Sequence, residues 1–502
     1  MATELTNHGN LLPSIQGGPN MNHMHGTSRA NSFGGNPDRL LPAEPDRRRV
    51  ARELYEQVAR LPIVSPHGHV PASLLADNQP FNNPAELFIT PDHYVTRLLH
   101  AHGVPLADLG VGAEPLSDEV ARRSWQILCE RWTVFAGTPM KYWLEDVLVN
   151  VFGVEERPDA ANAQFLYDHI DERLRDPAYL PRALVESFNI ETLATTDDPL
   201  SQLEHHVALR DDDAFTVDVV PTLRIEAYLD PANARWQDNV TALLDGAGRD
   251  DSFESYLSSI ADRRRYFAEN GAVSIDCALR DADTAVLRSE ELARLYLRAR
   301  RSELTGAEAA LFRAAMVTEI VRQSQEDGLV ITLHVGSLRD YDRTVHQVYG
   351  PDRGCDIPLA TGFAEGLRPL LNELGHDSAL HLVLFTLDET AWAREIAPLA
   401  GFYPSVYVGA PWWFLDEPEA ILRYRSAVTA VVGFGKQSGF IDDTRALCSI
   451  PSRHDMARRL DCAFLSKLVA EHRLSMDEAA FAIREISYGL PRATFKLERT
   501  GR

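Results

Sequence analysis

Two histidines directly after a short apolar run carry the clearest chemical signal in this sequence. Residues 61–69 read LPIVSPHGH, so His67 and His69 are two positions apart. In a strand, residues at this spacing point to the same side. We therefore expect both imidazoles to aim at one point just past the end of a strand. Two converging imidazoles make half of a divalent-metal site.

A second pair with the same spacing, His23 and His25, shows how weak the bare motif is. It lies within residues 1–40, which are rich in Asn, Gly, Ser, His and Pro and have no apolar periodicity. We predict a disordered or loosely attached N-terminal extension for these residues. Because no strand precedes His23, we interpret this pair as ordinary loop histidines.

Asp443 is the candidate for a third metal ligand, and its neighbour Asp442 competes for the role. Two neutral imidazoles and one carboxylate suit zinc, iron(II) or manganese, and they leave coordination positions open for substrate oxygens. The alternative for Asp443 is a loop acid or a helix N-cap. Whether it acts as a ligand, as a base or as both stays open.

Three arginines, Arg224, Arg339 and Arg445, are candidates for an anion pocket. A guanidinium binds a carboxylate bidentately and stays charged. The formal net charge of the chain is −23, so a small anionic substrate would need such arginines close by. The alternative is that each arginine is a structural salt-bridge partner in an acid-rich protein.

Short apolar runs separated by helical segments must position these residues. Such alternation implies right-handed crossovers and a parallel sheet. Eight runs favour an α/β fold, a (β/α)8 barrel within residues 41–502 with a mostly helical insertion at 70–188. The expected strands are 61–66, 192–196, 215–221, 272–276, 329–335, 380–387, 405–410 and 439–442.

Polar side chains directly follow most of these runs, and a barrel gathers its strand ends around one mouth. The fourth run ends at Asp276 without a lysine and the sixth at Asp388, so the pattern of the binuclear metal hydrolases is absent. The residues expected at the mouth are His67, His69, Asp197, Asp198, Arg224, Asp276, His334, Asp388, Trp412, Trp413, Asp443 and Arg445.

Composition excludes several other classes of protein. The acidic balance makes nucleic acid and anionic membranes poor partners. The N-terminus lacks the apolar segment of a secretory signal, and the five cysteines are scattered, so we expect a reducing cytoplasm. Since no Gly-x-Gly-x-x-Gly precedes a predicted helix, NAD is not expected.

From about residue 45 onward, the chain resembles the uronate isomerase (glucuronate isomerase) family of the amidohydrolase superfamily. Ordered motifs carry the resemblance, each modest alone and specific together. They are PHGHVPASLLADNQPFNN (66–83), DHYVTR (92–97), TTDDPLSQLEHH (195–206), VVPTLR (219–224), LHVGSLRD (333–340), PWWFLDE (411–417) and DDTRALCSIPSRHDMARR (442–459).

The resemblance implies a distorted (β/α)8 barrel that binds one divalent metal ion, which is zinc in described family members. It also implies a homo-oligomer, since some family members assemble as trimers. It implies isomerisation of D-glucuronate to D-fructuronate and of D-galacturonate to D-tagaturonate. The residues that match family positions are the ligands His67 and His69, the catalytic Asp443, the insertion residues His93 and Tyr94, the substrate-binding Arg224, Arg339 and Arg445, and the site-lining His334, Asp276 and Trp412.

An aldose–ketose isomerase moves a proton from C2 to C1 through an enediolate, whose growing charge a metal stabilises. We expect Asp443 to be the base, with Tyr94 or His93 assisting ring opening. Two alternatives stay open. One is a mononuclear hydrolase or decarboxylase of the same superfamily acting on an acidic small molecule. The other is an inactive relative that serves as a binding protein.

Overall fold

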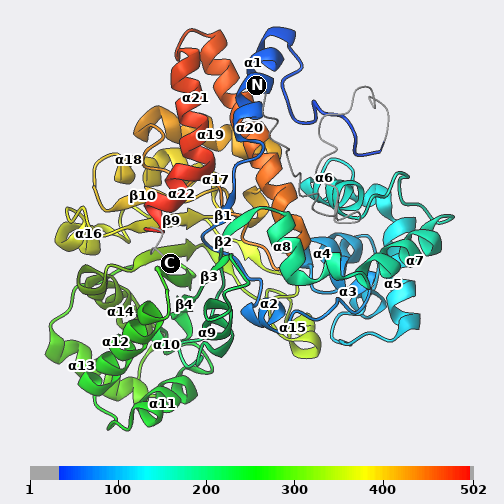
Figure 1. The fold of residues 1–502 in the computed structure, drawn as a ribbon. Helices are drawn as coiled ribbons and strands as arrows, with labels where there is room; N and C mark the ends of the chain where they lie inside the picture. Colours follow the sequence, from blue (N-terminus) through cyan, green and yellow to red (C-terminus); the bar gives the residue numbers. More distant parts are fainter. Residues whose placement is uncertain (1–32, 498–502) are drawn as a thin grey trace, which may run out of the picture.

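The computed structural model describes residues 33–497, whose strands form two parallel sheets (Figure 1). The first has the order β1-β2-β3, and the second has the order β10-β9-β6-β5-β4. Every pair within these sheets is parallel. The strands are β1 (Ile63–Ser65), β2 (Ile190–Ala194), β3 (Asp218–Val220), β4 (Thr222–Arg224), β5 (Ser274–Leu279), β6 (Val330–Val335), β9 (Leu382–Thr386) and β10 (Val406–Val408).

A single proline separates the two sheets. Pro221 stands between β3 and β4, and a proline cannot donate to a strand ladder. The chain nevertheless continues in the same direction, since Leu223 in β4 forms a parallel bridge with Asp197 just after β2. At the far edge, Val408 in β10 bridges Gln437, and the N–H of His69 donates to the carbonyl of Thr444 over 3.0 Å.

Seven of the eight predicted apolar runs contain strands, and the prediction for 439–442 is wrong. That segment is irregular, and one bridge at Gln437 is its nearest strand-like contact. Gly439 has a φ of +76°, which a β-strand cannot accommodate. A Cβ at this position would lie 2.5 Å from the ring of Pro491, so close packing against the C-terminal helix fixes the bend.

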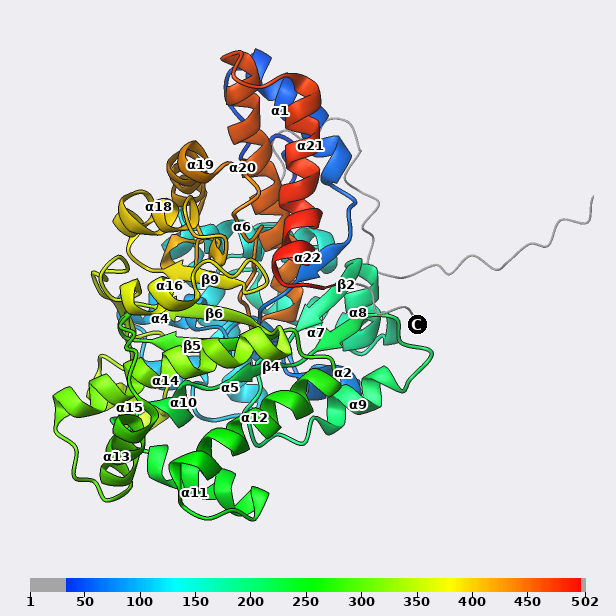
Figure 2. The same cartoon turned by 90° about the vertical axis from the view of Figure 1, so that its left-hand side faces the viewer.

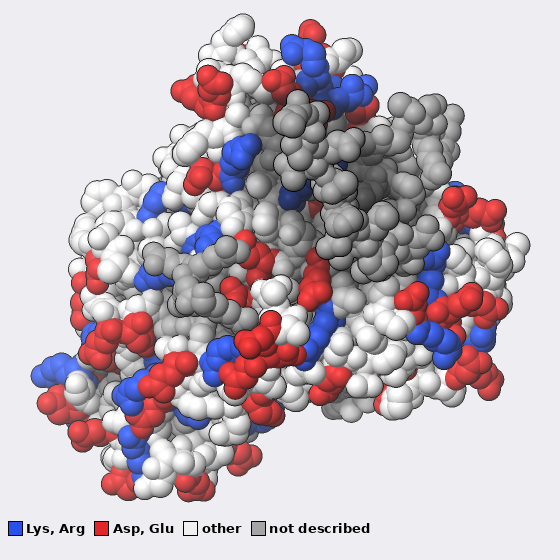
Figure 3. Space-filling view, viewed as in Figure 1, with Lys and Arg blue, Asp and Glu red and all other residues white. Residues whose placement is uncertain are grey.

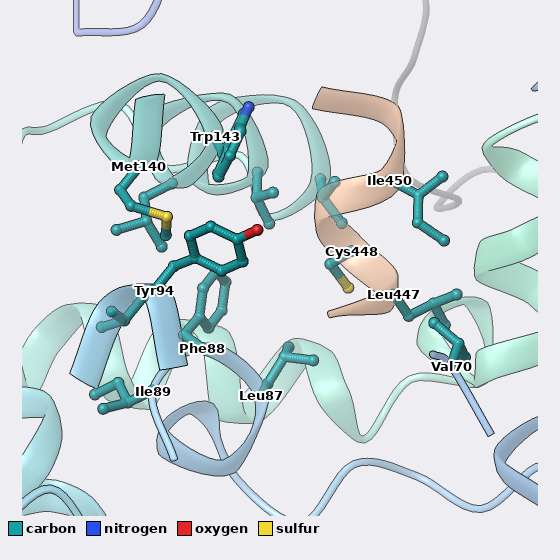
Figure 4. Close-up of a cluster of buried hydrophobic side chains, with 14 of the residues drawn as sticks. Val70, Leu87, Phe88, Ile89, Tyr94, Met140, Trp143, Leu447, Cys448 and Ile450 are labelled. Atoms are coloured by element: carbon teal, nitrogen blue, oxygen red, sulfur yellow. The ribbon is translucent and has the colours of Figure 1, made fainter. Parts of the chain in front are cut away.

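Helices make up most of the chain between β1 and β2, on the right of Figure 1. They are α2 (Ala72–Asp77), α3 (Pro84–Phe88), α4 (His93–Ala101), α5 (Asp118–Glu130), α6 (Pro139–Asp146), α7 (Ala163–Leu174) and α8 (Pro181–Ser187). Figure 4 shows how this insertion meets the segment after Asp443: Phe88, Tyr94, Met140 and Trp143 lie in one apolar cluster with Leu447, Cys448 and Ile450.

The remaining helices follow the later strands and close the chain. They are α9 (Glu204–Arg210), α10 (Glu226–Leu229), α11 (Trp236–Ala247), α12 (Phe253–Glu269), α13 (Ser289–Arg300), α14 (Gly306–Asp327), α15 (Arg343–Tyr349), α16 (Arg368–Leu374), α17 (Glu389–Ala391), α18 (Ala397–Ala400), α19 (Pro418–Val432), α20 (Ile450–Ala470), α21 (Met476–Arg484) and α22 (Leu490–Thr494). A short antiparallel pair, β7 (Ser337–Leu338) and β8 (Ile357–Pro358), flanks α15.

Helix α1 (Pro45–Val58) lies against α20 and α21, as both views show (Figures 1 and 2). Its buried Leu54 and Val58 share a cluster with Leu465 and Ile483. Part of the predicted N-terminal extension differs from expectation: Arg39 donates to Asp146 over 2.6 Å and Phe33 packs against Trp132. The rest of that extension, residues 1–32, lies outside the described residues.

The surface is charged with both signs interspersed on the face that Figure 3 shows. All five cysteines are free thiols. Within residues 33–497, no helix combines the length and the apolar character needed to cross a membrane.

Candidate active site

The loop that carries His67 and His69 is fixed by backbone contacts to two other parts of the chain. The hydroxyl of Thr196, just after β2, donates to the carbonyl of Gly68 over 2.8 Å. On the other side, the N–H of His69 donates to the carbonyl of Thr444. The two imidazoles are therefore held against the segment that contains Asp443.

His67, His69 and Asp443 converge as the sequence predicts. The Nε2 atoms of His69 and His67 lie 2.9 and 3.5 Å from Oδ1 of Asp443. The imidazole rings are close to perpendicular, at 79°. Among the described residues, Oδ1 of Asp443 has no hydrogen-bond partner, so this oxygen and the two imidazole nitrogens face one another across a short gap. This arrangement fits a bound cation.

Asp443, and not Asp442, faces the two imidazoles. Asp442 contacts His454, whose Nε2 lies 3.0 Å from its Oδ2. The backbone of Asp443 has a φ of +43°, a left-handed conformation that Asp tolerates better than most residues. Burial alone would raise the pKa of the Asp443 carboxyl, but His69 and His67 hold it well below its usual value. The carboxyl is therefore ionised at neutral pH.

His334 and Asp276 form a second buried pair beside His67. Nδ1 of His334 lies 2.7 Å from Oδ1 of Asp276, which also accepts a hydrogen bond from Thr332 over 2.9 Å. The His334 ring stacks between His67 and Phe385, at centroid distances of 4.7 and 4.2 Å. Together with His67, the pair makes a second set of potential cation ligands.

Each of the three predicted arginines has an acidic partner. Nε of Arg224 lies 2.6 Å from Glu226, Nη1 of Arg339 lies 3.0 Å from Asp356, and Nη2 of Arg445 lies 3.0 Å from Asp352. The salt-bridge interpretation therefore holds for each of them. All three nevertheless line the same pocket, so pairing and substrate contact do not exclude each other here.

His93 and Tyr94 lie at the start of α4, where Asp92 caps the helix by accepting from the N–H of Tyr94 over 2.9 Å. Burial and the nearby Arg445 lower the pKa of His93 to about 3, so this imidazole is neutral. Burial also raises the pKa of the Tyr94 phenol, which keeps its proton. Figure 4 shows the Tyr94 ring among Phe88, Met140 and Trp143.

One pocket brings the predicted site residues together. Every residue for which we predicted a site role lines it. They are His67, His69, His93, Tyr94, Arg224, Asp276, His334, Arg339, Trp412, Asp443 and Arg445.

Three acids expected at the mouth are not among the lining residues. The Asp197 carboxylate accepts a hydrogen bond from Thr195 over 2.5 Å, and Asp198 accepts one from the hydroxyl of Tyr228 over 2.8 Å. Asp388 caps α17 by accepting from the N–H of Thr390 over 3.0 Å. These three acids follow strands as predicted, but they do not line the pocket, because each side chain accepts a hydrogen bond from a neighbouring residue.

Sequence reasoning missed two acids that line the pocket, Asp92 and Asp352. Asp92 could have been found as an N-cap, since Asp directly before a helical segment is a common start signal. No comparable signal marks Asp352, because its position depends on how the loop after α15 folds back over the pocket.

Comparisons with known proteins agree on one family. A family profile described as glucuronate isomerase matches residues 46–495. The uronate isomerase of Cutibacterium acnes is 46% identical over 92% of this chain and 98% of its own length. The crystal structure of glucuronate isomerase from Caulobacter crescentus has a TM-score of 0.91 at 41% identity, covering 94% of this chain and 98% of that chain. The uronate isomerase structure from Thermotoga maritima gives 0.86 at 30% identity, with 92% and 99% covered.

Proposed function

Because this chain belongs to the glucuronate isomerase family, we propose a mechanism by which its pocket converts D-glucuronate, an aldose, to D-fructuronate, the corresponding ketose. One arrangement supports the mechanism above all others. His67, His69 and Asp443 converge in a pocket that also contains Arg224, Arg339 and Arg445. A cation site and an anion site in one cavity match a substrate with a reactive carbonyl edge and a carboxylate.

The residues that would hold a metal ion are His67, His69 and Asp443. Their donor set suits zinc among other divalent ions, and the unpartnered Oδ1 of Asp443 supports the fit. When bound, the ion supplies Lewis-acid stabilisation of the charge that grows on the sugar oxygens. We take zinc as the metal to be tested first.

The arginines orient the substrate. Arg224, Arg339 and Arg445 bind the C6 carboxylate, and Trp412 in the same wall supplies an apolar surface for the sugar carbons. With the acid group held, the sugar has one register relative to Asp443, and this positioning lowers the barrier to proton transfer.

Asp443 acts as the base that removes the C2 proton and returns it to C1. Its ionised state at neutral pH supports that role. Tyr94 keeps its proton and His93 is neutral, so both are suited to donate hydrogen bonds to sugar oxygens during ring opening. In the buried Asp276–His334 pair, Nδ1 of the neutral His334 ring donates to the Asp276 carboxylate, so Nε2, which has no hydrogen-bond partner among the described residues, supplies an acceptor for a sugar hydroxyl.

We further propose that the two sheets are halves of one distorted (β/α)8 barrel made by residues 41–502. The Leu223 and Val408 bridges and the His69–Thr444 hydrogen bond support this arrangement. From membership in the same family we also propose D-galacturonate as a second substrate. We propose a homo-oligomer, such as a trimer, as the active form, and a cytoplasmic location.

The decisive test follows the product. Purified chain supplied with zinc is incubated with D-glucuronate, and the products are identified by NMR. We expect D-fructuronate, and we expect none in a sample treated with a chelator. Carbon dioxide release would favour a decarboxylase instead, and an unchanged sugar in the zinc-loaded sample would contradict the proposal.

A further inference from the structure

Asp352 places a carboxylate between two of the arginines that face the pocket. Its Oδ2 lies 3.0 Å from Nη2 of Arg445, and its Oδ1 lies 3.5 Å from Nη1 of Arg339. Although burial raises it, the pKa of Asp352 is lowered overall by Arg445 and Arg339. The group is therefore a carboxylate at neutral pH, and it occupies the kind of position that a substrate carboxylate would take.

The other acids that pair with these arginines differ from Asp352. Asp356 is 1% exposed and also accepts the N–H of Asp340, so it is a fixed partner of Arg339. Glu226 pairs with Arg224. Neither Asp356 nor Glu226 lines the pocket, whereas Asp352 does. Within residues 33–497, Asp352 is also the only acid in salt-bridge contact with Arg445.

The segment that carries Asp352 lies at the edge of the core, against which only Val345 and Tyr349 of α15 pack. None of the residues of α15, which precedes it, is buried. The tip of the loop rests on α4, where a Cβ at Gly354 would lie 3.1 Å from the carbonyl oxygen of His93. The side chain of Asp352 is 38% exposed, so its two ion pairs are of the partly solvated kind that contributes little stability.

We propose that Asp352 is a binding-site residue that sets the affinity of the pocket for carboxylates, because its own carboxylate competes with that of the substrate for Arg445 and Arg339. This inference rests on the proposed function, since it takes these arginines as the carboxylate site. Competition weakens the binding of every carboxylate by a similar factor. A small anion without other contacts then binds weakly, whereas a sugar acid keeps its contacts at the His67–His69–Asp443 end and binds more tightly.

The test removes the charge and keeps the shape. Asp352 has a φ of +60°, and Asn tolerates this conformation as well as Asp does, so Asp352→Asn is the suitable variant. The probe is D-gluconate, a sugar acid without an aldehyde, measured by calorimetry together with the KM for D-glucuronate. We expect both the Kd and the KM to fall by about two- to fivefold, the range for partly exposed ion pairs. Binding of uncharged D-glucose should not change.

Asp342→Asn is the matched control. Asp342 is on the same segment and caps α15 by accepting from the N–H groups of Thr344 and Val345. Asn retains the cap, so this variant removes one negative charge without touching an arginine. We expect its Kd and KM to equal those of the unchanged chain.

The outcomes separate the two proposals. If D-glucuronate is isomerised but Asp352→Asn binds D-gluconate equally or more weakly, Asp352 positions Arg445 and the competition model is wrong. If D-glucuronate is not isomerised but Asp352→Asn still binds D-gluconate more tightly, the proposed function fails and the competition stands. If neither protein binds D-gluconate, the arginines are not a carboxylate site and both fail.

Discussion

Oδ1 of Asp443 lies 2.9 Å from Nε2 of His69, yet among the described residues this oxygen has no hydrogen-bond partner. Buried carboxylate oxygens normally accept hydrogen bonds. Oδ1 of the neighbouring Asp442 is also without a partner, but its Oδ2 contacts His454 at 3.0 Å. Asp443 differs in that its unpartnered oxygen lies within 3.5 Å of two imidazole nitrogens, as a shared metal ion requires, and this arrangement gives the site its first test.

Replacing His67 and His69 together by Ala should abolish metal binding. Two of the three donors disappear, and a single carboxylate retains a divalent ion poorly. Atomic emission spectroscopy of the purified chain should find close to one ion per chain before the change and almost none after it. The control replaces His23 and His25, which have the same spacing with no predicted strand before them. Full metal occupancy in the His67/His69 variant would show that the ion lies elsewhere.

Asp443→Asn should lower turnover by at least about 100-fold, the low end of what a positioned general base contributes. The amide keeps the size of the side chain but cannot accept the C2 proton. In D2O, the unchanged chain should incorporate deuterium at C1 of the product, because a carboxylic acid exchanges its proton with solvent. NMR of the product measures this. An active Asn variant without solvent deuterium in its product would limit Asp443 to metal binding.

Site residues that lie on or directly after strands could be predicted from the sequence, whereas Asp352, which lies in a loop, could not. His67 follows β1, His334 is next to last in β6, and Asp276 lies within β5, which continues to Leu279 beyond the predicted end of that run. Parallel strands bring their carboxyl ends to one mouth. Their meeting could be predicted without knowing any loop. Asp352 belongs to a loop outside the sheets, and its place depends on packing of Gly354 against α4, which local sequence does not encode.

The same reasoning explains the error in the fold. Residues 439–442 include apolar Phe440 and Ile441, as a strand would, and both are buried. The positive φ of Gly439 nevertheless breaks the extended conformation. Burial could be predicted from composition there, but the bend is dictated by contact with Pro491, which is distant in the sequence.

Replacing each arginine of the anion pocket by Met should lower kcat/KM for D-glucuronate. A charge-assisted hydrogen bond contributes about 1.5–3 kcal/mol, which corresponds to a loss of roughly 10- to 100-fold. We expect Arg445→Met to act mainly on KM, since Asp352 is its acidic neighbour and remains solvated when unpaired. An uncharged aldose should be a poor substrate of the unchanged chain. If it reacts as well as D-glucuronate, the arginines are structural.

Arg453 should matter for stability, because it is a buried cation behind the pocket. Its Nη1 lies 3.0 Å from Oδ2 of Asp416, and its guanidinium lies 3.7 Å from the centre of the Trp143 ring. Arg453→Met leaves Asp416 buried without this partner, which typically costs about 3–5 kcal/mol. Burial already raises the pKa of Asp416 to about 7, so protonation should reduce that cost below neutral pH.

Urea unfolding at pH 8 and at pH 6 measures the effect of Arg453→Met. The added change Asp416→Asn should restore part of the lost stability at pH 8, since it removes the unpaired carboxylate. Equal stability of the unchanged chain and Arg453→Met at both pH values would show that the pair contributes nothing to folding.

His206 should make the stability of the fold depend on pH. It lies in α9, its Nε2 is 2.8 Å from the hydroxyl oxygen of Thr195, and burial together with His205 lowers its pKa to about 4. In the unfolded chain its pKa returns to about 6.5. Between pH 6.5 and 4 the unfolded state therefore binds more protons than the native state, and stability falls as the pH falls through this window.

The variant His206→Gln isolates this contribution. Gln can still donate to Thr195 but does not titrate, so the variant should lose less stability than the unchanged chain on acidification. The difference should grow at up to about 1.4 kcal/mol per pH unit, reaching at most about 3 kcal/mol near pH 4. Asp197, whose pKa burial raises to about 6, contributes in the opposite direction, and its Oδ2 lies 3.6 Å from Nε2 of His206. Because the two groups titrate together, both proteins are compared with Asp197 replaced by Asn. Urea midpoints at pH 7.5, 6.0 and 5.0 test this. If the stability of the two proteins depends on pH in the same way, the pKa of His206 is not lowered in the native state.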